Sequence, residues 1–354
     1  MRKRPRPFSY NLKGAMNLSL GRLKLSSAII QSPMAACTDL PFRLIAREKG
    51  LGFSFLEMVS AQALVKDNAK TRKLLQSAPE DRPLGAQLLG CDPAIMAEAA
   101  RIIEDMNFDL LDLNLGCPVR KVVLNGEGAA LLKEPQKAEA VFKAVKSAVK
   151  KIPLTVKMRA GFENPTGEEA ALIAQRAEAC GFDAVTVHGR TQKQGYAGTA
   201  DYTAIGRVKQ AVKIPVIGNG DVVNAKSARE IRAVSGCDGV MIGRGGLGNP
   251  WIYRNLDESL ENQSCDYVPP IQERRETLLK HLNLERSLLG DRQAALNTRR
   301  IVVWYTAGLP NSKALRGEVC RTTDMNAIIS MVGDFFSALP ENAPPPEAPM
   351  LLAE

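Results

Sequence analysis

Short apolar runs alternate with amphipathic segments along most of the chain from about residue 28. Each run is rich in small and β-branched residues and ends in a polar or glycine-containing turn. Nearly continuous apolar strands separated by helices are typical of a parallel sheet that helices cover. Eight such runs are present: Ala28–Ala35, Phe53–Ala61, Pro83–Gly90, Leu110–Cys117, Leu154–Gly161, Ala184–Thr191, Pro215–Val222 and Gly239–Gly248. The helical period is clearest in four of the segments between them: Pro93–Asn107, Lys137–Lys150, Glu168–Cys180 and Ala225–Ser235.

Eight strand–helix units in about 230 residues predict a TIM (β/α)8 barrel. A doubly wound open sheet is the alternative that the pattern alone leaves open. In a barrel, the chemistry gathers at the carboxyl ends of the strands, and the distinctive residues of this chain fall there. They are Met34, Gln87, Asn114, Cys117, Lys157, Arg159, His188, Arg190, Asn219 to Asp221, Gly243 and Arg244.

A second region follows the barrel pattern. The stretch Tyr267–Ile271 (YVPPI) has the composition of a linker. Beyond it, apolar residues recur at intervals of three and four residues, which predicts helices, and no strand pattern lies between them. The helical segments are Glu273–Leu289, Ala294–Thr306 and Met325–Ala338. We therefore predict four parts: a basic flexible extension (1–22), a barrel domain (23–265), a small helical bundle (266–339) and a Pro- and Ala-rich disordered tail (340–354).

Composition excludes several classes of protein. Hydrophobic residues make up 45% of the 354 residues, and no stretch approaches the roughly 18 apolar residues of a membrane span. No apolar segment follows the basic start of the chain, so we expect no secretory signal. Seven dispersed cysteines without a CxxC pair argue against disulfides and structural zinc, and favour the cytoplasm. With only two histidines, His188 and His281, we expect no metal site.

The net charge of +9 is unevenly distributed. Residues 1–27 hold seven Lys or Arg and no acidic residue, whereas residues 266–354 hold ten basic and eleven acidic residues. A basic protein suggests a polyanionic partner such as RNA. Because most of the excess lies in the N-terminal extension, a merely solubilising role for that segment is an equal alternative.

Two glycine clusters end the seventh and eighth predicted strands: GNGD at Gly218–Asp221 and GRGGLGNPW at Gly243–Trp251. A barrel's recurring anion site lies at these two loops. Glycine lets backbone N–H groups approach phosphate oxygens, and Arg244 adds a charge-assisted hydrogen bond. Either cluster alone is explained by a tight turn, but the two together favour a bound phosphate.

Three long polar side chains could complete a flavin site. Gln87, Lys157 and His188 end the third, fifth and sixth predicted strands. A cationic donor near the polar edge of the flavin ring stabilises the charge of its reduced form. Taken singly, Lys157 is as well explained as a lysine at the barrel rim, and His188 as a structural histidine.

Cys117 lies between Gly116 and Pro118 at the end of the fourth predicted strand, in the sequence NLGCP. Glycine and proline force a turn, which places the thiol on a rim rather than inside a helix. A free thiol has a pKa near 8.5, so it is mostly protonated at neutral pH and can donate a proton. No histidine neighbours it in sequence, which weakens a protease-like nucleophile as the alternative. A buried structural cysteine also remains open.

These motifs resemble those of the tRNA-dihydrouridine synthases. The resemblance is carried by SPMA at Ser32–Ala35, TDLPFR at Thr38–Arg43, LNLGCP at Leu113–Pro118, VTVHGRTQKQGYAG at Val185–Gly198 and the two glycine clusters. The stretch Val302–Tyr305 with Ala307–Pro310 is similar to the helical domain of the bacterial B-type branch. Together the motifs span residues from about 20 to 338, and several ordered motifs are far more specific than one.

The resemblance implies a flavin enzyme that reduces the C5=C6 bond of uridines in tRNA. FMN would be the cofactor and NADPH the reductant, with hydride passing from flavin N5 to C6 and a proton from Cys117 to C5. The implied FMN contacts are Pro33, Met34, Ala35, Gln87, Lys157, His188, Asn219, Gly220, Asp221, Gly243 and Arg244. Asn114, Arg159 and Arg190 would line the uracil site, and the helical bundle would help bind tRNA.

Two pairs of basic residues could contact RNA. Arg120-Lys121 and Arg299-Arg300 are candidate phosphate contacts, or else solvated charged surface. The chain departs from the family pattern at Ala36-Cys37, where glycine and an aliphatic residue are usual, and Cys37 could be redox-sensitive. We expect a monomer. The alternative function is an FMN-dependent barrel oxidoreductase acting on a free pyrimidine or a dihydroorotate-like molecule, which would not need the bundle.

Overall fold

The structure, a computed structural model, describes residues 17–262, 267–340 and 343. Eight parallel strands form one sheet in the order β3-β10-β9-β8-β7-β6-β5-β4. They are β3 (Ile29–Gln31), β4 (Ser54–Ser60), β5 (Leu84–Leu89), β6 (Leu110–Leu115), β7 (Leu154–Gly161), β8 (Ala184–Thr191), β9 (Val216–Asn219) and β10 (Gly239–Ile242). A bridge between Ile30 and Phe53 joins the two ends of the sheet. The strands therefore form a closed barrel, which excludes the open sheet that the pattern had left possible.

The seam between β3 and β4 depends on one side chain. Backbone pairing there is limited to the Ile30–Phe53 bridge and a hydrogen bond of 3.1 Å from Gln31 N to Phe53 O. The fully buried Gln31 adds a side-chain link, because its Oε1 accepts from Phe55 N at 3.1 Å. The side-chain amide oxygen of Gln31 thus takes the place of a backbone carbonyl where few backbone hydrogen bonds join β3 and β4.

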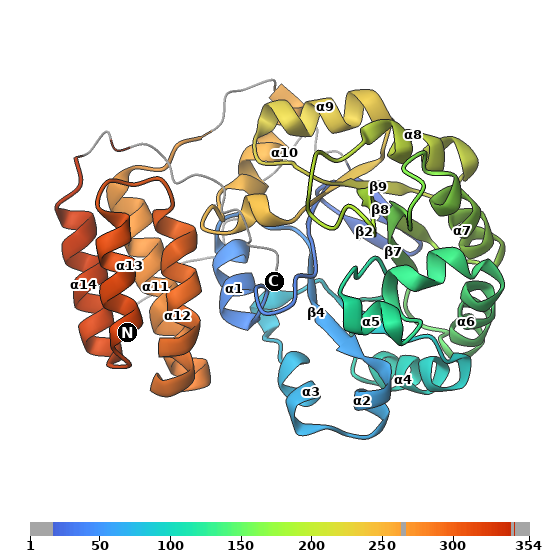
Figure 1. Cartoon of the computed structure of the whole chain (residues 1–354), viewed down its shortest axis with the longest axis horizontal. Coiled ribbons are helices and arrows are strands. Elements are labelled where there is room, and N and C mark those ends of the chain that lie inside the picture. The colour runs from blue at the N-terminus through green and yellow to red at the C-terminus, as the bar shows by residue number, and fades with distance from the viewer. Residues whose placement is uncertain (1–16, 263–266, 341–342, 344–354) are drawn as a thin grey trace, which may run out of the picture.

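Helices surround the barrel (Figure 1). They are α1 (Leu40–Glu48), α2 (Ala61–Val65), α3 (Ala69–Leu74), α4 (Pro93–Asp105), α5 (Arg120–Leu124), α6 (Pro135–Ala148), α7 (Glu168–Ala179), α8 (Tyr202–Ala211), α9 (Ala225–Ser235) and α10 (Ile252–Asn262). Side-chain caps fix where several begin, since Asp39, Asp92 and Asp201 accept from backbone N–H groups in the first turns of α1, α4 and α8. The four predicted outer helices are confirmed with ends that differ by no more than two residues.

A hairpin of β1 (Leu18–Leu20) and β2 (Leu23–Leu25) precedes the barrel. Its buried leucines form one apolar cluster with barrel residues such as Phe53, Phe55 and Met241. The cluster lies at the amino ends of the strands, so the hairpin covers that end of the barrel and leaves the other end for a site. The hairpin crosses the boundary predicted between residues 22 and 23, and each of its two strands carries leucines at alternate positions, Leu18 and Leu20 in β1 and Leu23 and Leu25 in β2.

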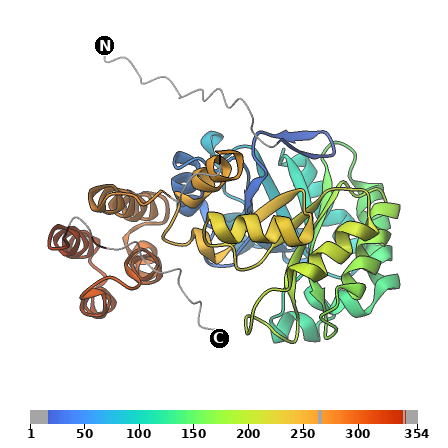
Figure 2. The same ribbon diagram turned by 90° about the horizontal axis from the view of Figure 1, so that it is seen from above.

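The remaining helices form a bundle beside the barrel, next to α1 and α10 (Figures 1 and 2). They are α11 (Ile271–Leu289), α12 (Asp291–Thr306), α13 (Ser312–Arg321) and α14 (Met325–Ser337). Three were predicted, and α13 was not. Most of the predicted disordered tail lies outside the described residues, although Ala343 is described and its carbonyl accepts from Arg274 Nη2 at 2.7 Å. None of the described helices is long and apolar enough to cross a membrane.

Candidate active site

A pocket of about 230 Å³ opens at the carboxyl ends of the barrel strands. It brings together most of the predicted site residues: Pro33, Met34, Ala35, Asn114, Cys117, Lys157, Arg159, His188, Asn219, Gly220, Asp221, Gly243 and Arg244. Gln87 and Arg190 do not line it. The structure places both directly behind lining residues, where they hold other side chains.

Positive charge dominates the pocket, because its lining holds three cationic side chains, Lys157, Arg159 and Arg244, and a single carboxylate, that of Asp221. Lys157 projects from the middle of β7 and makes no hydrogen bond or ion pair with any described residue. Burial, together with the charge of Arg159, lowers the pKa of Lys157 to about 8. At neutral pH it therefore remains a cation without a partner, which suits an anionic or electron-rich ligand.

His188 lies on β8 beside Asn219 of β9 and lines the same pocket. Burial lowers the pKa of His188 well below its ordinary value, and the surrounding cations Arg159, Lys157, Arg190 and Arg244 lower it further. The imidazole is therefore neutral, with one ring nitrogen as donor and the other as acceptor. It can bond a ligand without adding charge.

Asp221 connects the two glycine clusters. Its Oδ1 accepts from Arg190 Nη1 at 2.8 Å and from Arg244 Nη2 at 3.3 Å. Burial raises the pKa of Asp221, but the hydrogen bonds of Arg190 and Ala200 and the nearby arginine charges outweigh it, so the pKa is lowered. Two guanidinium groups share this one carboxylate, and a net positive charge remains at the predicted phosphate loops.

The backbone around Asp221 needs its glycines. Gly220 has φ +133°, and a Cβ there would come within 2.5 Å of the Ala200 Cβ. Gly243 differs, because an added Cβ would meet only the Met34 sulfur, at 3.8 Å. The free space over Gly243 lets a ligand approach its backbone closely.

Arg159 lines the pocket, and its Nε and Nη1 groups donate three hydrogen bonds to loop carbonyls. Its Nε donates to Gly116 O at 2.9 Å, and Nη1 donates to Thr191 O at 2.8 Å and Gly195 O at 2.7 Å. Burial lowers the pKa of Arg159 to about 10, so it stays charged. It therefore ties the Cys117 loop to the loop after β8.

Tyr196 was quoted in the sequence motif but not predicted as a site residue. The ring is 44% exposed at the pocket mouth, and the guanidinium carbons of Arg159 and Arg244 lie 5.6 and 5.5 Å from its centroid. An exposed aromatic on a strand-end loop was the signal that could have revealed it. Sequence reasoning also missed other lining residues, including Met58 and Val119, which carry no chemical signal of their own.

The Cys117 thiol forms part of the pocket wall and is 8% exposed. Burial raises the pKa of Cys117 above that of a free thiol, and a backbone hydrogen bond at Val119 and the charges of Arg159 and Lys157 only partly oppose this. The thiol is therefore protonated at neutral pH. A protonated thiol in the pocket wall is what the predicted proton donor requires.

The departure at Ala36-Cys37 has a visible conformational cost. Ala36 adopts φ +59°, a left-handed conformation that favours glycine, and its N–H donates to Glu57 Oε2 at 2.6 Å. Burial raises the pKa of Cys37 to about 11, which disfavours the reactive thiolate. The expected redox sensitivity of Cys37 thus gains no support from its surroundings.

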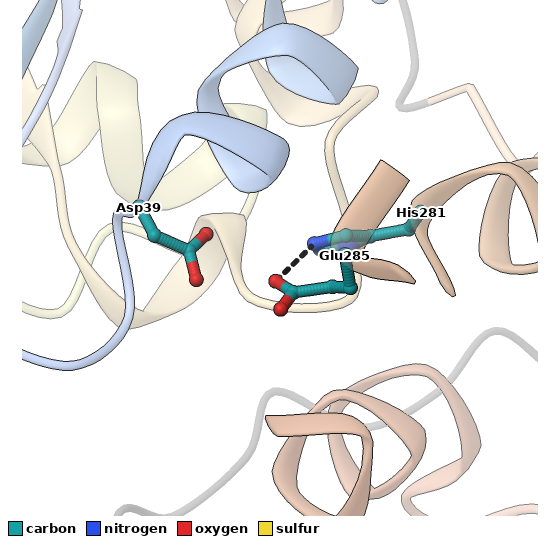
Figure 3. A group of neighbouring side chains, drawn as sticks. All are labelled: Asp39, His281 and Glu285. Atoms are coloured by element: carbon teal, nitrogen blue, oxygen red, sulfur yellow. Dashed lines mark ion pairs between the residues drawn. The ribbon is translucent and has the colours of Figure 1, made fainter. Parts of the chain in front are cut away.

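A second polar cluster lies between barrel and bundle. It contains Asp39, His281 and Glu285, which Figure 3 shows, together with Arg300, and we call it the domain joint. Asp39 caps α1, and the other three belong to α11 and α12. Arg300 Nη2 lies 3.7 Å from Asp39 Oδ2, and His281 Nε2 lies 3.9 Å from Glu285 Oε1. Because Asp39 already faces a cation, the joint is poorly suited to a metal ion.

Burial neutralises the interior of the domain joint. It raises the pKa of Glu285 to about 8, with the charge of Asp39 as the next cause, and it lowers the pKa of His281 to about 4. Asn297 Nδ2 donates to Glu285 Oε2 at 2.8 Å, and a hydrogen bond between the carboxyl groups of Glu285 and Asp39 further favours the protonated form of Glu285. At neutral pH the joint therefore contains a protonated carboxyl, a neutral imidazole and one ion pair.

Comparison with known proteins identifies the class that this barrel and pocket define. The sequence model of the dihydrouridine synthase (Dus) family matches residues 30–338, so the chain belongs to that family. Among relatives, a Rickettsia conorii protein named "Probable tRNA-dihydrouridine synthase" is 38% identical over 325 residues, 92% of this chain and 98% of its own length. The Pseudomonas aeruginosa protein named tRNA-dihydrouridine synthase B is 35% identical over 323 residues, 91% and 97% of the two chains. The B-type resemblance of the sequence agrees with the latter name.

Solved structures of other proteins share the fold. The histamine dehydrogenase of Rhizobium sp. 4-9 superposes with a TM-score of 0.54 at 13% identity, over 76% of this chain and 50% of that one. A 2-naphthoyl-CoA reductase superposes with a TM-score of 0.53 at 12% identity, over 69% and 52%. This chain thus spans about half the length of these two proteins, and the likeness confirms the predicted barrel fold.

Proposed function

We propose that this protein is a tRNA-dihydrouridine synthase, which reduces the C5=C6 bond of uridines in tRNA. Family membership and the names of the relatives support the reaction. The observation that carries it is the Cys117 thiol, held protonated in the wall of a cationic pocket at the barrel mouth. Reduction of a C=C bond needs a hydride and a proton, and in this proposal the thiol gives the proton to C5.

The residues that line the pocket support a flavin mononucleotide as the cofactor that we propose. The phosphate would bind at the loops after β9 and β10, where Gly243 leaves its backbone accessible and Arg244 adds charge. The unpaired ammonium of Lys157 and the neutral imidazole of His188 would bond the polar edge of the ring. Pro33, Met34, Ala35, Asn219, Gly220 and Asp221 would complete the contacts. When bound, the flavin supplies the hydride for uracil C6, and NADPH is the reductant that we propose for it.

Gln87 and Arg190 would then act one layer below the ligands. Gln87 is fully buried and bonded to Asn114, and Arg190 is bonded to Asp221. We propose that they position these pocket residues rather than bind FMN or uracil themselves. Arg159 likewise holds the walls of the uracil site through its three carbonyl partners.

A uridine must leave its stack to reach this pocket, because the site lies below the rim of the barrel. Tyr196 offers an aromatic face at the mouth, on which a base can stack. Arg120 and Lys121 are exposed on α5, directly after the Cys117 loop, and could bind phosphates. Arg300, by contrast, is used in the domain joint, so it is a weaker candidate for tRNA contact.

The test is dihydrouridine formation in unmodified tRNA by the flavin-loaded protein with NADPH. We expect activity in the wild type and a loss of about 10²- to 10⁴-fold in Cys117→Ala, the usual worth of a general acid. Cys320→Ala removes an exposed cysteine of the bundle and should leave the rate unchanged. A yellow protein that oxidises NADPH, leaves tRNA intact and reduces a free pyrimidine would overturn the tRNA assignment. An unimpaired Cys117→Ala variant would overturn the proton donor.

A further inference from the structure

A chain of buried hydrogen bonds leads from Asp112 to the loop that carries Cys117. Asp112 lies in β6, and its neighbours in register are Gln87 of β5 and Thr155 of β7. Thr155 Oγ1 donates to Asp112 Oδ1 at 2.6 Å, and Gln87 Nε2 donates to Oδ2 at 2.7 Å. Gln87 Oε1 then accepts from Asn114 Nδ2 at 2.8 Å, one layer closer to the pocket.

The chain ends on the backbone of the cysteine loop. Asn114 Oδ1 accepts from Gly116 N at 3.0 Å and from Cys117 N at 2.9 Å. These two bonds fold the backbone back over the end of β6. They hold the residue whose thiol forms the pocket wall.

The two backbone N–H groups at the loop end of this chain determine which group donates and which accepts in the bonds that link Asn114, Gln87 and Asp112. A backbone N–H can only donate, so Asn114 must present its oxygen to the loop and its NH2 group to Gln87. Gln87 must therefore present its oxygen to Asn114 and its own NH2 group downward. That group needs an acceptor, and the group beneath it is the carboxylate of Asp112. A donor at this position would reverse both amides and leave the two loop N–H groups facing an NH2 group.

We propose that Asp112 is a positioning residue, which fixes the Cys117 loop through Gln87 and Asn114. Asp112 is 1% exposed and does not line the pocket, so it touches neither cofactor nor substrate. Its role is to supply an acceptor at the one place where the chain needs it. The inference deepens the proposed function, on which its catalytic readout rests.

Asp112 could also act through its negative charge rather than as a hydrogen-bond acceptor. Burial raises the pKa of Asp112 to about 6, while the bonds from Thr155 and Gln87 and the charge of Lys157 oppose the rise. Asp112 is therefore ionised at neutral pH, and it could act on Lys157 by charge alone. The experiment must separate the acceptor from the charge.

Two substitutions make that separation. Asp112→Asn removes the charge but can keep the chain, because its carbonyl can face Gln87 while its NH2 group donates to the Thr155 hydroxyl, which also accepts. Asp112→Leu is similar in shape and removes both acceptors. Thr155→Val is the matched control, since it deletes one bond to the same carboxylate and leaves the chain to Cys117 intact.

The first readout is the rate at which iodoacetamide alkylates Cys117 in the purified holoenzyme, followed on its own peptide by mass spectrometry. Cys117 is only 8% exposed in the pocket wall, so a loosened loop should present more of the thiol to the reagent and raise the alkylation rate. We expect several-fold faster alkylation in Asp112→Leu and little change in Asp112→Asn or Thr155→Val. The exposed Cys320 reports the reagent dose in each sample. This readout does not depend on dihydrouridine synthesis, so it distinguishes failure of the inference from failure of the proposed function.

The second readout is steady-state kinetics with tRNA. We expect kcat of Asp112→Leu to fall about 10- to 100-fold while KM for tRNA changes little, because a misplaced proton donor affects the chemical step. Asp112→Asn should retain kcat to within about threefold. Wild-type alkylation and kcat in Asp112→Leu would overturn the inference, as would equal losses in the Asn and Leu variants, which would assign the effect to charge.

If Asp112→Leu does not fold, an exchange of the two groups decides. Gln87→Glu alone places two carboxylates against each other and should expose Cys117. Gln87→Glu/Asp112→Asn restores the chain with the charge moved one position, since the carboxylate introduced on β5 then accepts from the amides on both sides of it. We expect the double variant to regain slow alkylation of Cys117, and failure to regain it would overturn the inference.

Discussion

The pocket and the domain joint both bury ionisable groups with unsatisfied polar atoms, yet they are built for opposite outcomes. In the pocket, Lys157, Arg159 and Arg244 remain charged around a single carboxylate and face a cavity. In the joint, Glu285 and His281 are kept neutral, and the remaining charges of Asp39 and Arg300 face each other. Desolvation acts in both places, but only the pocket retains an excess of charge for a ligand to neutralise.

Removing the unpaired cation should have the largest effect. Lys157→Met is expected to weaken flavin retention and to lower dihydrouridine synthesis by about 100-fold, because an electrostatic contact in a dry site is lost. Since the pKa of Lys157 is about 8 and the ammonium is the lower-pH form, wild-type activity should decline as pH rises through 8. The variant should lack that decline.

The matched control for this prediction is Lys133→Met. Lys133 is exposed and lies over the Phe162 ring at 4.8 Å, outside the pocket lining. Flavin absorbance after gel filtration and rates between pH 6.5 and 9.5 provide the measurement. Full flavin content and an unchanged pH profile in Lys157→Met would show that the pocket's charge excess has no role.

The joint should respond to pH through stability instead. The pKa of Glu285 is raised from 4.5 to about 8 in the folded protein, so the folded state binds more protons than the unfolded state in this window. Stability should therefore fall as pH rises from about 4.5 to 8, by about 1.4 kcal/mol for each pH unit within the window. Glu285→Gln imitates the neutral carboxyl and should remove this loss.

Urea unfolding at pH 6.5 and 8.5 measures the difference, in a range above the titration of His281, whose pKa is about 4. The loss should reach about 2 kcal/mol at most in the wild type and shrink in Glu285→Gln. Glu276→Gln is the control, an exposed carboxyl of the same helix. Parallel changes in all three proteins would contradict a neutral Glu285, and activity should be unaffected by either substitution.

The smallest effect is expected at Ala36, on the loop that leads from the pocket to the joint. Ala36→Gly relieves a left-handed conformation, and the gain should be under about 1 kcal/mol because glycine also loses more entropy on folding. Flavin content and the pH dependence of stability should not change. Ala35→Gly next to it is expected to destabilise, and a thermal melt of both variants checks the opposite signs.

Much of the fold follows from the sequence because the barrel strands are buried on both faces. The predicted runs Leu154–Gly161 and Ala184–Thr191 coincide with β7 and β8, whereas β3 and β10 end earlier than predicted, before residues such as Pro33 and Gly243. The helix α13 was missed because SKALRGEVCR has a glycine and few apolar residues, of which Leu315 and Val319 are buried. Its packing against α12 and α14 has no signature in its own sequence.

The sequence predicted where the site lies, but not which of its residues line the pocket and which lie behind the lining. Cys117 follows the end of β6, whereas Lys157 lies in the middle of β7, and both line the pocket. Strand-end position could not show that Gln87 and Arg190 turn their polar groups to neighbouring side chains, because a side chain's partners depend on register across strands. The domain joint could not be predicted for the same reason, since Asp39 and Glu285 are far apart in the chain and lie together only in the folded protein.

The barrel closure has a consequence for how the protein is made. The first barrel strand, β3, pairs along its length with the last, β10. Roughly two hundred residues must therefore be synthesised after β3 before its main partner leaves the ribosome. The helix α1 next to β3 waits longer still for α11. A nascent chain therefore exposes an apolar edge for most of its synthesis, at some tens of seconds at ordinary translation rates of about 5–20 residues per second. A chaperone that binds nascent apolar segments would find its natural target here, at the beginning of the barrel.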